Sequence, residues 1–207
     1  MRRINCTRFF PIVLVTMLSG GCATPTRYVY RSKMDTSNTV TYLSKAQPPL
    51  KLEIPGTYWK TSALGYNHII LANTKQPPRR IINIFEYDDG ALRQRFYKPG
   101  FSEEQAVEEY SLAESKYQSS KRPAFQYRII ERNLAGPVSP NLLWSLESER
   151  DRIFFLTMSK DRHLISLSVQ DLDEPARAQE VILEMFRSIT FLTREKADYI
   201  LRTETNP

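Results

Sequence analysis

The sequence predicts an α+β domain built on an antiparallel sheet, and three observations support this fold class. Short runs of alternating apolar and polar residues are joined by polar turns, which is typical of antiparallel strands. Two longer segments carry apolar residues at the spacing of amphipathic helices. An apolar run close to the N-terminus follows several arginines, which indicates a signal peptide before the folded domain.

Composition excludes several classes of protein. Of the 207 residues, 41% are hydrophobic and 25% are charged, which are ordinary values for a globular domain and exclude a disordered chain. The net charge of +6 is concentrated in residues 1–49, so residues 50–207 carry equal numbers of acidic and basic groups. A formally neutral body lacks the charge pattern of a nucleic-acid binder, and we expect no nucleic-acid partner.

The N-terminus has the pattern of an exported protein. Basic residues precede an apolar run over 9–18, which is too short to cross a hydrocarbon core of about 30 Å. A run of this length is typical of a signal peptide, which we assign to residues 1–21. The signal ends in the small residues Ser19, Gly20 and Gly21, directly before Cys22.

These small residues before Cys22 resemble the lipobox of bacterial lipoproteins. In that family the signal is cleaved before the cysteine, the thiol carries diacylglycerol and the new amine is often acylated, for example with palmitate. The resemblance implies that Cys22 is the point of contact with membrane lipid. Ala23, in place of an aspartate, implies the outer membrane, with the domain in the periplasm. The alternatives are an ordinary signal with an incidental cysteine, or an uncleaved anchor.

Residues 22–49 are predicted to be the lipidated cysteine followed by a flexible tether, because they are rich in Thr, Ser and Pro without a sustained period. Tyrosines and basic residues gather inside this segment. They either contact lipid head groups or belong to a solvated linker, and the linker is the favoured interpretation. The cluster consists of Arg27, Tyr28, Tyr30, Arg31 and Lys33.

The folded domain begins with strands. Apolar residues alternate from Leu50 to Ile54, and Pro55-Gly56 ends that strand. Residues 66–73 and 80–87 are predicted to be two further strands. Residues 91–97 are either a short strand or an irregular connection.

A helix follows, and a meander of strands comes after it. Ser102 and Gln105 form a capping box, and Pro123 stops the helix. Its predicted buried stripe consists of Ala106, Tyr110, Ala113 and Tyr117. Four antiparallel strands are then predicted over 125–132, 142–149, 153–159 and 164–170. Alternation in the last strand predicts one wet face with Leu164, Ser166, Ser168 and Gln170, and one buried face.

The C-terminal part is predicted to be helical. A second amphipathic helix opens at Asp173, followed by a short helix over about 194–202 that either docks on the body or meets a partner. Docking is the favoured interpretation. The apolar stripe of the first of these two helices consists of Ala178, Val181, Ile182, Met185, Phe186 and Ile189.

This order of elements, with Leu52-Glu53-Ile54-Pro55, Trp59 and the stretch from Arg187 to Phe191, resembles the family of the photosystem PsbP protein and Mog-type nuclear-transport factors. The resemblance covers residues 50–192 and leaves 193–207 as a C-terminal helix and tail. It implies an antiparallel sheet sandwiched between helices, an α/β/α arrangement. It also implies assembly, binding or accessory roles, without catalytic machinery common to the family and without a transferable site.

Motifs for catalysis or cofactors are missing from the sequence. The seven glycines form neither a dinucleotide nor a P-loop motif, so we expect no nucleotide cofactor. His68 and His163 have no second ligand at metal-binding spacing, which predicts no metal site. His68 is predicted to be an ordinary strand residue and His163 a turn residue. Asp88-Asp89-Gly90 is predicted to be a turn in preference to a cation loop.

One segment suggests a binding site. Arg93, Arg95, Tyr97 and Lys98 place basic and aromatic groups just before a helix N-terminus, where anions bind favourably. A phosphate, a glycan carboxylate or an acidic partner could bind there. In the alternative, which is favoured, the aromatic residues cap the core and the arginines pair with Glu86 or Asp88.

Together these observations predict a membrane-anchored lipoprotein that acts as a non-catalytic binding or assembly module of the cell envelope, with an envelope protein as its partner. Three alternatives stay open. A carrier of an apolar ligand would contain a large apolar cavity. An envelope hydrolase would bring Ser, His and acidic side chains together in a cleft. A component of a larger envelope machine would co-purify with fixed partners.

Overall fold

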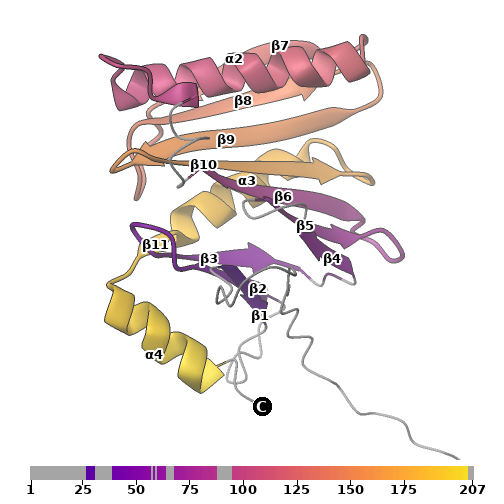
Figure 1. Ribbon diagram of the computed structural model, residues 1–207. Coiled ribbons are helices and arrows are strands. Elements are labelled where there is room, and N and C mark those ends of the chain that lie inside the picture. Colours follow the sequence, from indigo (N-terminus) through magenta and orange to yellow (C-terminus); the bar gives the residue numbers. More distant parts are fainter. Residues whose placement is uncertain are drawn as a thin grey trace, which may run out of the picture.

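The computed structural model describes residues 27–30, 39–56, 58, 60–63, 68–87 and 95–204. Two antiparallel sheets and three helices form this part of the chain (Figure 1). In the larger sheet the strand order is β4 (Lys60–Ala63), β5 (His68–Asn73), β6 (Arg80–Tyr87), β10 (His163–Asp171), β9 (Arg152–Lys160), β8 (Asn141–Glu147), β7 (Gln126–Arg132). In the smaller sheet the order is β1 (Arg27–Tyr30), β2 (Thr39–Ser44), β3 (Leu50–Pro55), β11 (Thr190–Phe191).

The helices cover the sheets on different sides. Helix α2 (Glu103–Lys121) contacts β8 and β9, and α3 (Arg177–Ser188) lies between β3 of the smaller sheet and β9 and β10 of the larger one (Figure 1). Helix α4 (Arg194–Glu204) packs on β1 and β2 at the end of the molecule opposite α2. The mixed α+β class and the antiparallel pairing agree with the prediction. The larger sheet lies between α2 and α3, as the predicted α/β/α arrangement requires. The smaller sheet forms an additional layer on the other side of α3.

The meander from β7 to β10 follows the predicted strands closely. Each strand pairs with the next in antiparallel register. Asp161 and Arg162 join β9 to β10 with φ values of 51° and 60°. Two successive positive φ values match the type I′ turn, whose twist suits a tight hairpin.

The prediction of a wet face on β10 was wrong. Ser166 and Ser168 are only 1% and 3% exposed, because α2 and the segment before it cover this face of the sheet. Their hydroxyls are satisfied inside the protein: Ser166 Oγ lies 3.3 Å from Thr157 Oγ1, and Ser168 Oγ accepts a hydrogen bond from Asn83 Nδ2 at 2.9 Å. Small hydroxyl side chains with sheet partners therefore gave a false signal of solvent exposure.

Helix α2 begins as predicted, but its buried face is different. Ser102 and Gln105 form the capping box. Ala106 and Tyr110 are buried, whereas Tyr117 is 58% exposed. The buried side of the helix runs through Val107, Ser111 and Ser115, because Val107 packs against Trp144 and Phe155 on the sheet.

Helix α3 carries the predicted apolar stripe but begins later than predicted. All six stripe residues are buried in the core between the sheets. The helix starts at Arg177 instead of Asp173, because the Asp171 carboxylate accepts hydrogen bonds from the backbone N–H groups of Asp173 and Glu174. This Asx-type turn holds the chain in a non-helical conformation before the helix.

The predicted flexible tether is corrected for the part that the structure describes. Residues 27–30 and 39–44 form β1 and β2, and Tyr42 and Leu43 are both 0% exposed. Tyr42 points into the core between the sheets and Leu43 packs under α4. Polar and apolar residues alternate only over 39–42 of β2, and Leu43 then places an apolar group on the opposite face. An alternation this short inside a Thr- and Ser-rich segment is a weak signal, which explains why sequence reasoning missed the strand.

The favoured interpretation of the last helix, docking on the body, is confirmed. Ala197 and Leu201 of α4 are buried against Tyr30 and Leu43. The body therefore extends beyond both ends of the predicted segment 50–192. The predicted signal peptide, Cys22, Arg93 and the Asp88-Asp89-Gly90 turn lie outside the described residues. In the part of the chain that is described, no helix has the length and apolar character needed to cross a bilayer.

Candidate functional site

The segment predicted to bind anions places its aromatic residues in the interior. Tyr97 is 4% exposed and its hydroxyl pairs with Ser159 Oγ on β9. Phe96 is also 4% exposed and packs edge-on against both Tyr87 and Tyr110 under α2. These two aromatic residues cap the core, as the favoured alternative predicted, and Tyr97 offers no accessible surface for a ligand.

The basic residues of the same segment lie at the surface. Arg95 sits over the Phe96 ring, and Lys98 Nζ pairs with Glu109 Oε1 at 3.0 Å. The adjoining N-terminus of α2 is occupied by its own acids: Glu103 accepts a hydrogen bond from the Arg162 backbone at 2.6 Å, and hydrogen bonds from the Glu104 backbone and Ser102 lower the pKa of Glu104. An external anion would meet this negative charge. Of the predicted residues that the structure describes, Tyr97 is buried and Lys98 is already paired with an acid.

A polar cluster that the sequence analysis did not identify lies between the two sheets. Glu86 Oε2 on β6 accepts hydrogen bonds from Arg27 Nε on β1 at 3.0 Å and from Ser44 Oγ on β2 at 2.7 Å. His163 Nε2 on β10 lies 3.7 Å from the same oxygen. Glu86 and His163 are 0% and 1% exposed. His163, predicted to be a turn residue, is thus a buried strand residue. These four residues are called the inter-sheet cluster below.

Strand register places the inter-sheet cluster. Alternate residues of β6 and β10 point to the same face, so the register that buries Ile84 and Ile165 also buries Glu86 and His163. On the smaller sheet, Arg27 is paired directly with Ser44. The buried positions of β6 carry a charged residue at each end, Arg80 and Glu86, with isoleucines between them. This was a signal in the sequence, but the partners of Glu86 lie 42 and 59 residues away in the chain.

The electrostatics of the inter-sheet cluster favour an ionised carboxylate. Burial acts to raise the pKa of Glu86, but contact with His163, the charge of Arg27 and the Ser44 hydroxyl outweigh it and hold the pKa below its ordinary value. For the neighbouring Tyr42, burial raises the pKa well above its ordinary value, and the negative charge of Glu86 adds to this. At neutral pH a buried carboxylate therefore faces a buried guanidinium and a neutral phenol.

Part of the hydrogen-bonding capacity of this region is unused. Among the described residues, Glu86 Oε1, both ring nitrogens of His163 and the Tyr42 hydroxyl are buried without a hydrogen-bond partner. Each such atom costs about 1–3 kcal/mol relative to a satisfied one. The desolvation of these groups offsets part of the stability that the ion pair between the sheets provides. The pair stabilises the fold only while both Arg27 and Glu86 are present, because either charge alone would be buried without a counter-ion.

The chemistry of the inter-sheet cluster resembles a hydrolytic triad in composition but not in connectivity. A nucleophilic serine must hydrogen-bond the histidine that removes its proton. Here the Ser44 hydroxyl donates to the carboxylate instead. Over the described ranges, no group of three His, Cys, Asp or Glu side chains is arranged to hold a metal ion. The arrangement fastens the two sheets together.

The second histidine behaves as predicted for an ordinary strand residue. His68 Nε2 lies 3.1 Å from Asn83 Oδ1, and its ring stacks on Phe85 at 3.7 Å between centroids. Burial lowers its pKa, against a smaller opposite effect of Asn83.

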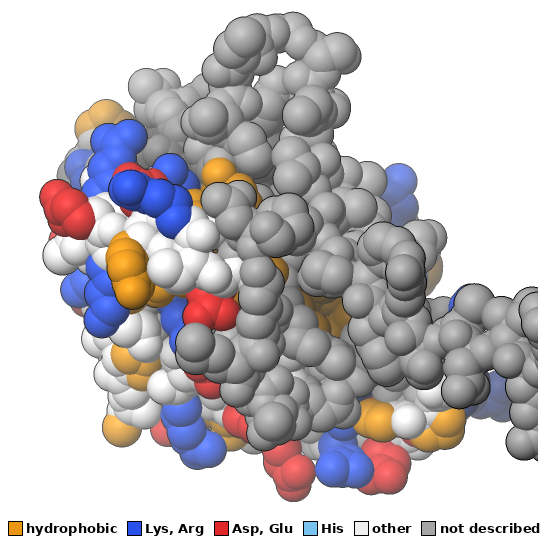
Figure 2. All heavy atoms as spheres, turned by 90° about the horizontal axis from the view of Figure 1, so that it is seen from below, with side chains coloured by type: hydrophobic (Ala, Val, Ile, Leu, Met, Phe, Trp, Pro, Cys, Tyr) orange, Lys and Arg blue, Asp and Glu red, His pale blue; other side chains and the backbone are white. Residues whose placement is uncertain are grey.

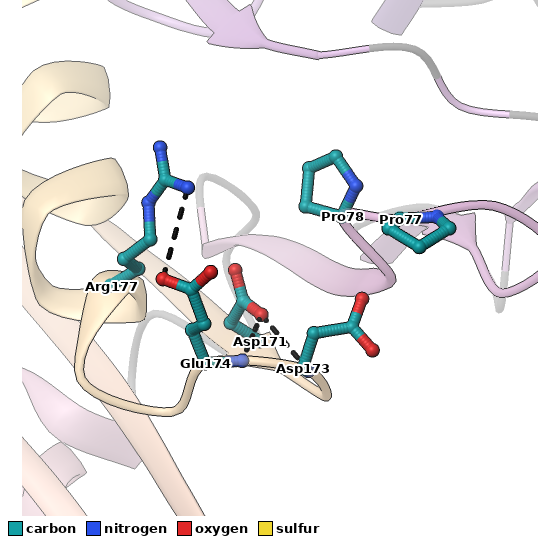
Figure 3. Close-up of a pocket in the computed structure, with 6 residues that line it drawn as sticks. All are labelled: Pro77, Pro78, Asp171, Asp173, Glu174 and Arg177. Atoms are coloured by element: carbon teal, nitrogen blue, oxygen red, sulfur yellow. Dashed lines mark hydrogen bonds and ion pairs between the residues drawn. The ribbon is translucent and has the colours of Figure 1, made fainter.

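A surface pocket of about 210 Å³ lies where α3 approaches the loop before β6 (Figure 3). All three of its carboxylates have basic partners. Asp171 pairs with Arg80 at 2.7 Å, Asp173 with Arg79 at 2.7 Å and Glu174 with Arg177 at 3.8 Å. The pocket is therefore polar and internally neutralised. Its lining consists of Pro77, Pro78, Asp171, Asp173, Glu174 and Arg177.

Comparison with known proteins supports the fold. No family model matches the chain, and no curated protein matches it in sequence. Among solved structures, the chain is similar to the solution structure of cyanobacterial PsbP (CyanoP) from Synechocystis sp. PCC 6803, with a TM-score of 0.50 and 7% identity. The match covers 85% of this chain and 98% of that one. The predicted PsbP-like fold is therefore confirmed, and at this identity the likeness concerns the fold alone.

Proposed function

We propose that the protein is an outer-membrane lipoprotein, anchored through acylated Cys22 with its domain in the periplasm, and that it acts as a non-catalytic binding or assembly module of the cell envelope. The lipobox-like sequence before Cys22 supports the anchor. The PsbP-like fold supports a binding or assembly role, because the resemblance implies such roles and no shared catalytic machinery.

The connectivity of the inter-sheet cluster is the observation that carries the non-catalytic part of this proposal. Serine, histidine and carboxylate side chains do converge, but they converge at 0–1% exposure and the serine bonds the carboxylate. The structure uses these reactive groups to join its sheets. Molecular recognition then falls to the surface, and the lipid anchor raises the effective concentration of that surface near envelope partners.

Affinity purification tests the proposal. The full-length protein is purified from gently solubilised membranes, next to a Cys22→Ala variant whose folding is verified by circular dichroism. We expect a reproducible set of envelope proteins with the parent and its loss with the variant. A co-purifying lipid without protein partners would support the apolar carrier instead. Equal recovery of partners with both proteins would contradict a role for the anchor.

A further inference from the structure

The point at which the chain joins the folded body restricts how the body can sit on a membrane. Cys22 precedes Arg27, the first residue of β1, by five residues. Five residues extend by at most about 17 Å. An anchor this short cannot lift the body away from the bilayer, so the surface next to Arg27 must lie close to the lipid.

Helix α4 forms the surface next to this point. Arg27 is paired with Ser44, and the following residue, Lys45, forms an ion pair with Asp198 of α4 at 2.5 Å. The buried side of α4 packs on Tyr30 of the same strand. The middle of α4 is therefore held directly beside the N-terminal end of β1.

The outer side of α4 has the chemistry of a membrane–water interface. Lys196, Tyr199 and Arg202 are exposed and follow one another at three-residue spacing, which places them on one side of a helix. Tyr199 is 66% exposed, more than the other exposed large hydrophobic side chains of the described residues. Tyrosine settles at head-group level and basic side chains attract anionic lipid.

We propose that Lys196, Tyr199 and Arg202 of α4 rest on the head groups of a bilayer containing anionic lipid, and so fix the orientation of the anchored body. This inference rests on the proposed anchor at Cys22. Figure 2 views the underside of the molecule and shows basic side chains beside exposed hydrophobic ones on the side where α4 lies, with acidic groups among them. Glu195 and Glu204 belong to the same helix and offset part of its attraction to anionic lipid. The acyl chains therefore supply the attachment to the membrane, and α4 sets the orientation of the body.

Helix α2 provides a matched control. Its Tyr117 is 58% exposed and has Lys121 over its ring at 5.8 Å, so its local chemistry resembles that of Tyr199. In contrast to α4, this helix covers the far side of the larger sheet (Figure 1). If the chemistry of an exposed tyrosine alone were enough for lipid contact, both Tyr117 and Tyr199 would contact lipid. If the position of the anchor decides, only Tyr199 would contact lipid.

The test measures how close each position lies to the head groups. Mature protein carrying Tyr199→Cys or Tyr117→Cys is purified from membranes and labelled on the new thiol with a small fluorophore. It is then placed in phosphatidylethanolamine–phosphatidylglycerol vesicles that contain a head-group nitroxide lipid. We expect several-fold stronger quenching at position 199 than at 117. Equal quenching, or stronger quenching at 117, would overturn the proposal, including the case in which a protein partner covers α4.

The parent protein separates this proposal from the anchor on which it depends. If Cys22 is acylated, the mature parent has no free thiol and takes up no fluorophore. Labelling of the parent would refute the anchor and the orientation together. If the parent takes up no label and the Tyr199→Cys and Tyr117→Cys variants are quenched equally, the orientation alone is refuted. In the Tyr199→Cys background, Lys196→Gln with Arg202→Gln should remove the dependence of quenching on phosphatidylglycerol. An unchanged dependence would overturn the role of these two cations.

Discussion

Replacement of Glu86 by glutamine would break the ionic contact between the two sheets while keeping the size of the side chain. Ser44 could still donate to the amide oxygen, but Arg27, whose side chain is 8% exposed, would lose its buried anion. Removing one partner of a buried ion pair costs about 3–5 kcal/mol. Because Arg27 is not fully enclosed, we expect the free energy of unfolding to fall by about 3 kcal/mol, at the lower end of that range.

Chemical denaturation measures this change, and Glu109→Gln is the matched control. Glu109 pairs with Lys98 at the same distance of 3.0 Å, but both side chains are more than 40% exposed. Such a surface pair contributes about 0–1 kcal/mol. A double variant, Arg27→Met with Glu86→Leu, should recover much of the lost stability because neither charge is left alone. A loss for Glu86→Gln no larger than that for Glu109→Gln would refute the assignment of the inter-sheet cluster.

The same carboxylate predicts a pH dependence with a definite sign. The pKa of Glu86 in the folded protein lies below its ordinary value of 4.5, so the folded state binds this proton less readily than the unfolded state. The stabilisation is complete above that ordinary value and is lost as the pH falls through the lower folded value. The difference in stability between the parent and Glu86→Gln should therefore shrink in this acidic window. A difference that grows on acidification would contradict the sign.

Three further substitutions test other parts of the structure. Gly136→Ala should lower the unfolding free energy by about 1–3 kcal/mol, because a Cβ there would overlap the buried ring of Phe186, and a thermal melt unchanged from the parent would contradict this contact. Ser102→Ala should cost about 1 kcal/mol in denaturant titration through loss of the capping box, and a neutral result would count against that box. Arg95→Ala should leave the unfolding free energy within about 0.5 kcal/mol in denaturant titration, because this exposed side chain only lies over the Phe96 ring, and a loss of more than about 1 kcal/mol would contradict its placement at the surface.

The features that sequence reasoning predicted correctly are local. The Ser102–Gln105 capping box and the apolar stripe of α3 arise from neighbours within a few residues, and the polar turns of the meander sit between strands adjacent in the chain. Such signals remain readable without knowledge of tertiary contacts.

The features that it missed depend on distant partners. Strands β1 and β2 are short, and β1 pairs with β2 while β2 pairs with β3. Their burial also depends on packing under α4, which lies at the other end of the described chain. The inter-sheet cluster joins residues from four strands, and Glu86 alone shows only a charge at a core position. Tyr97 shows the converse case: it is interleaved with basic residues in the sequence, but tertiary packing buries its ring.

Mass spectrometry of the N-terminal peptide of the mature, membrane-extracted protein tests the central claim most directly, because the binding role and the orientation of α4 both depend on the anchor. We expect a chain that begins at Cys22 and carries diacylglycerol on the thiol. A chain that begins elsewhere, or an unmodified Cys22, would contradict it.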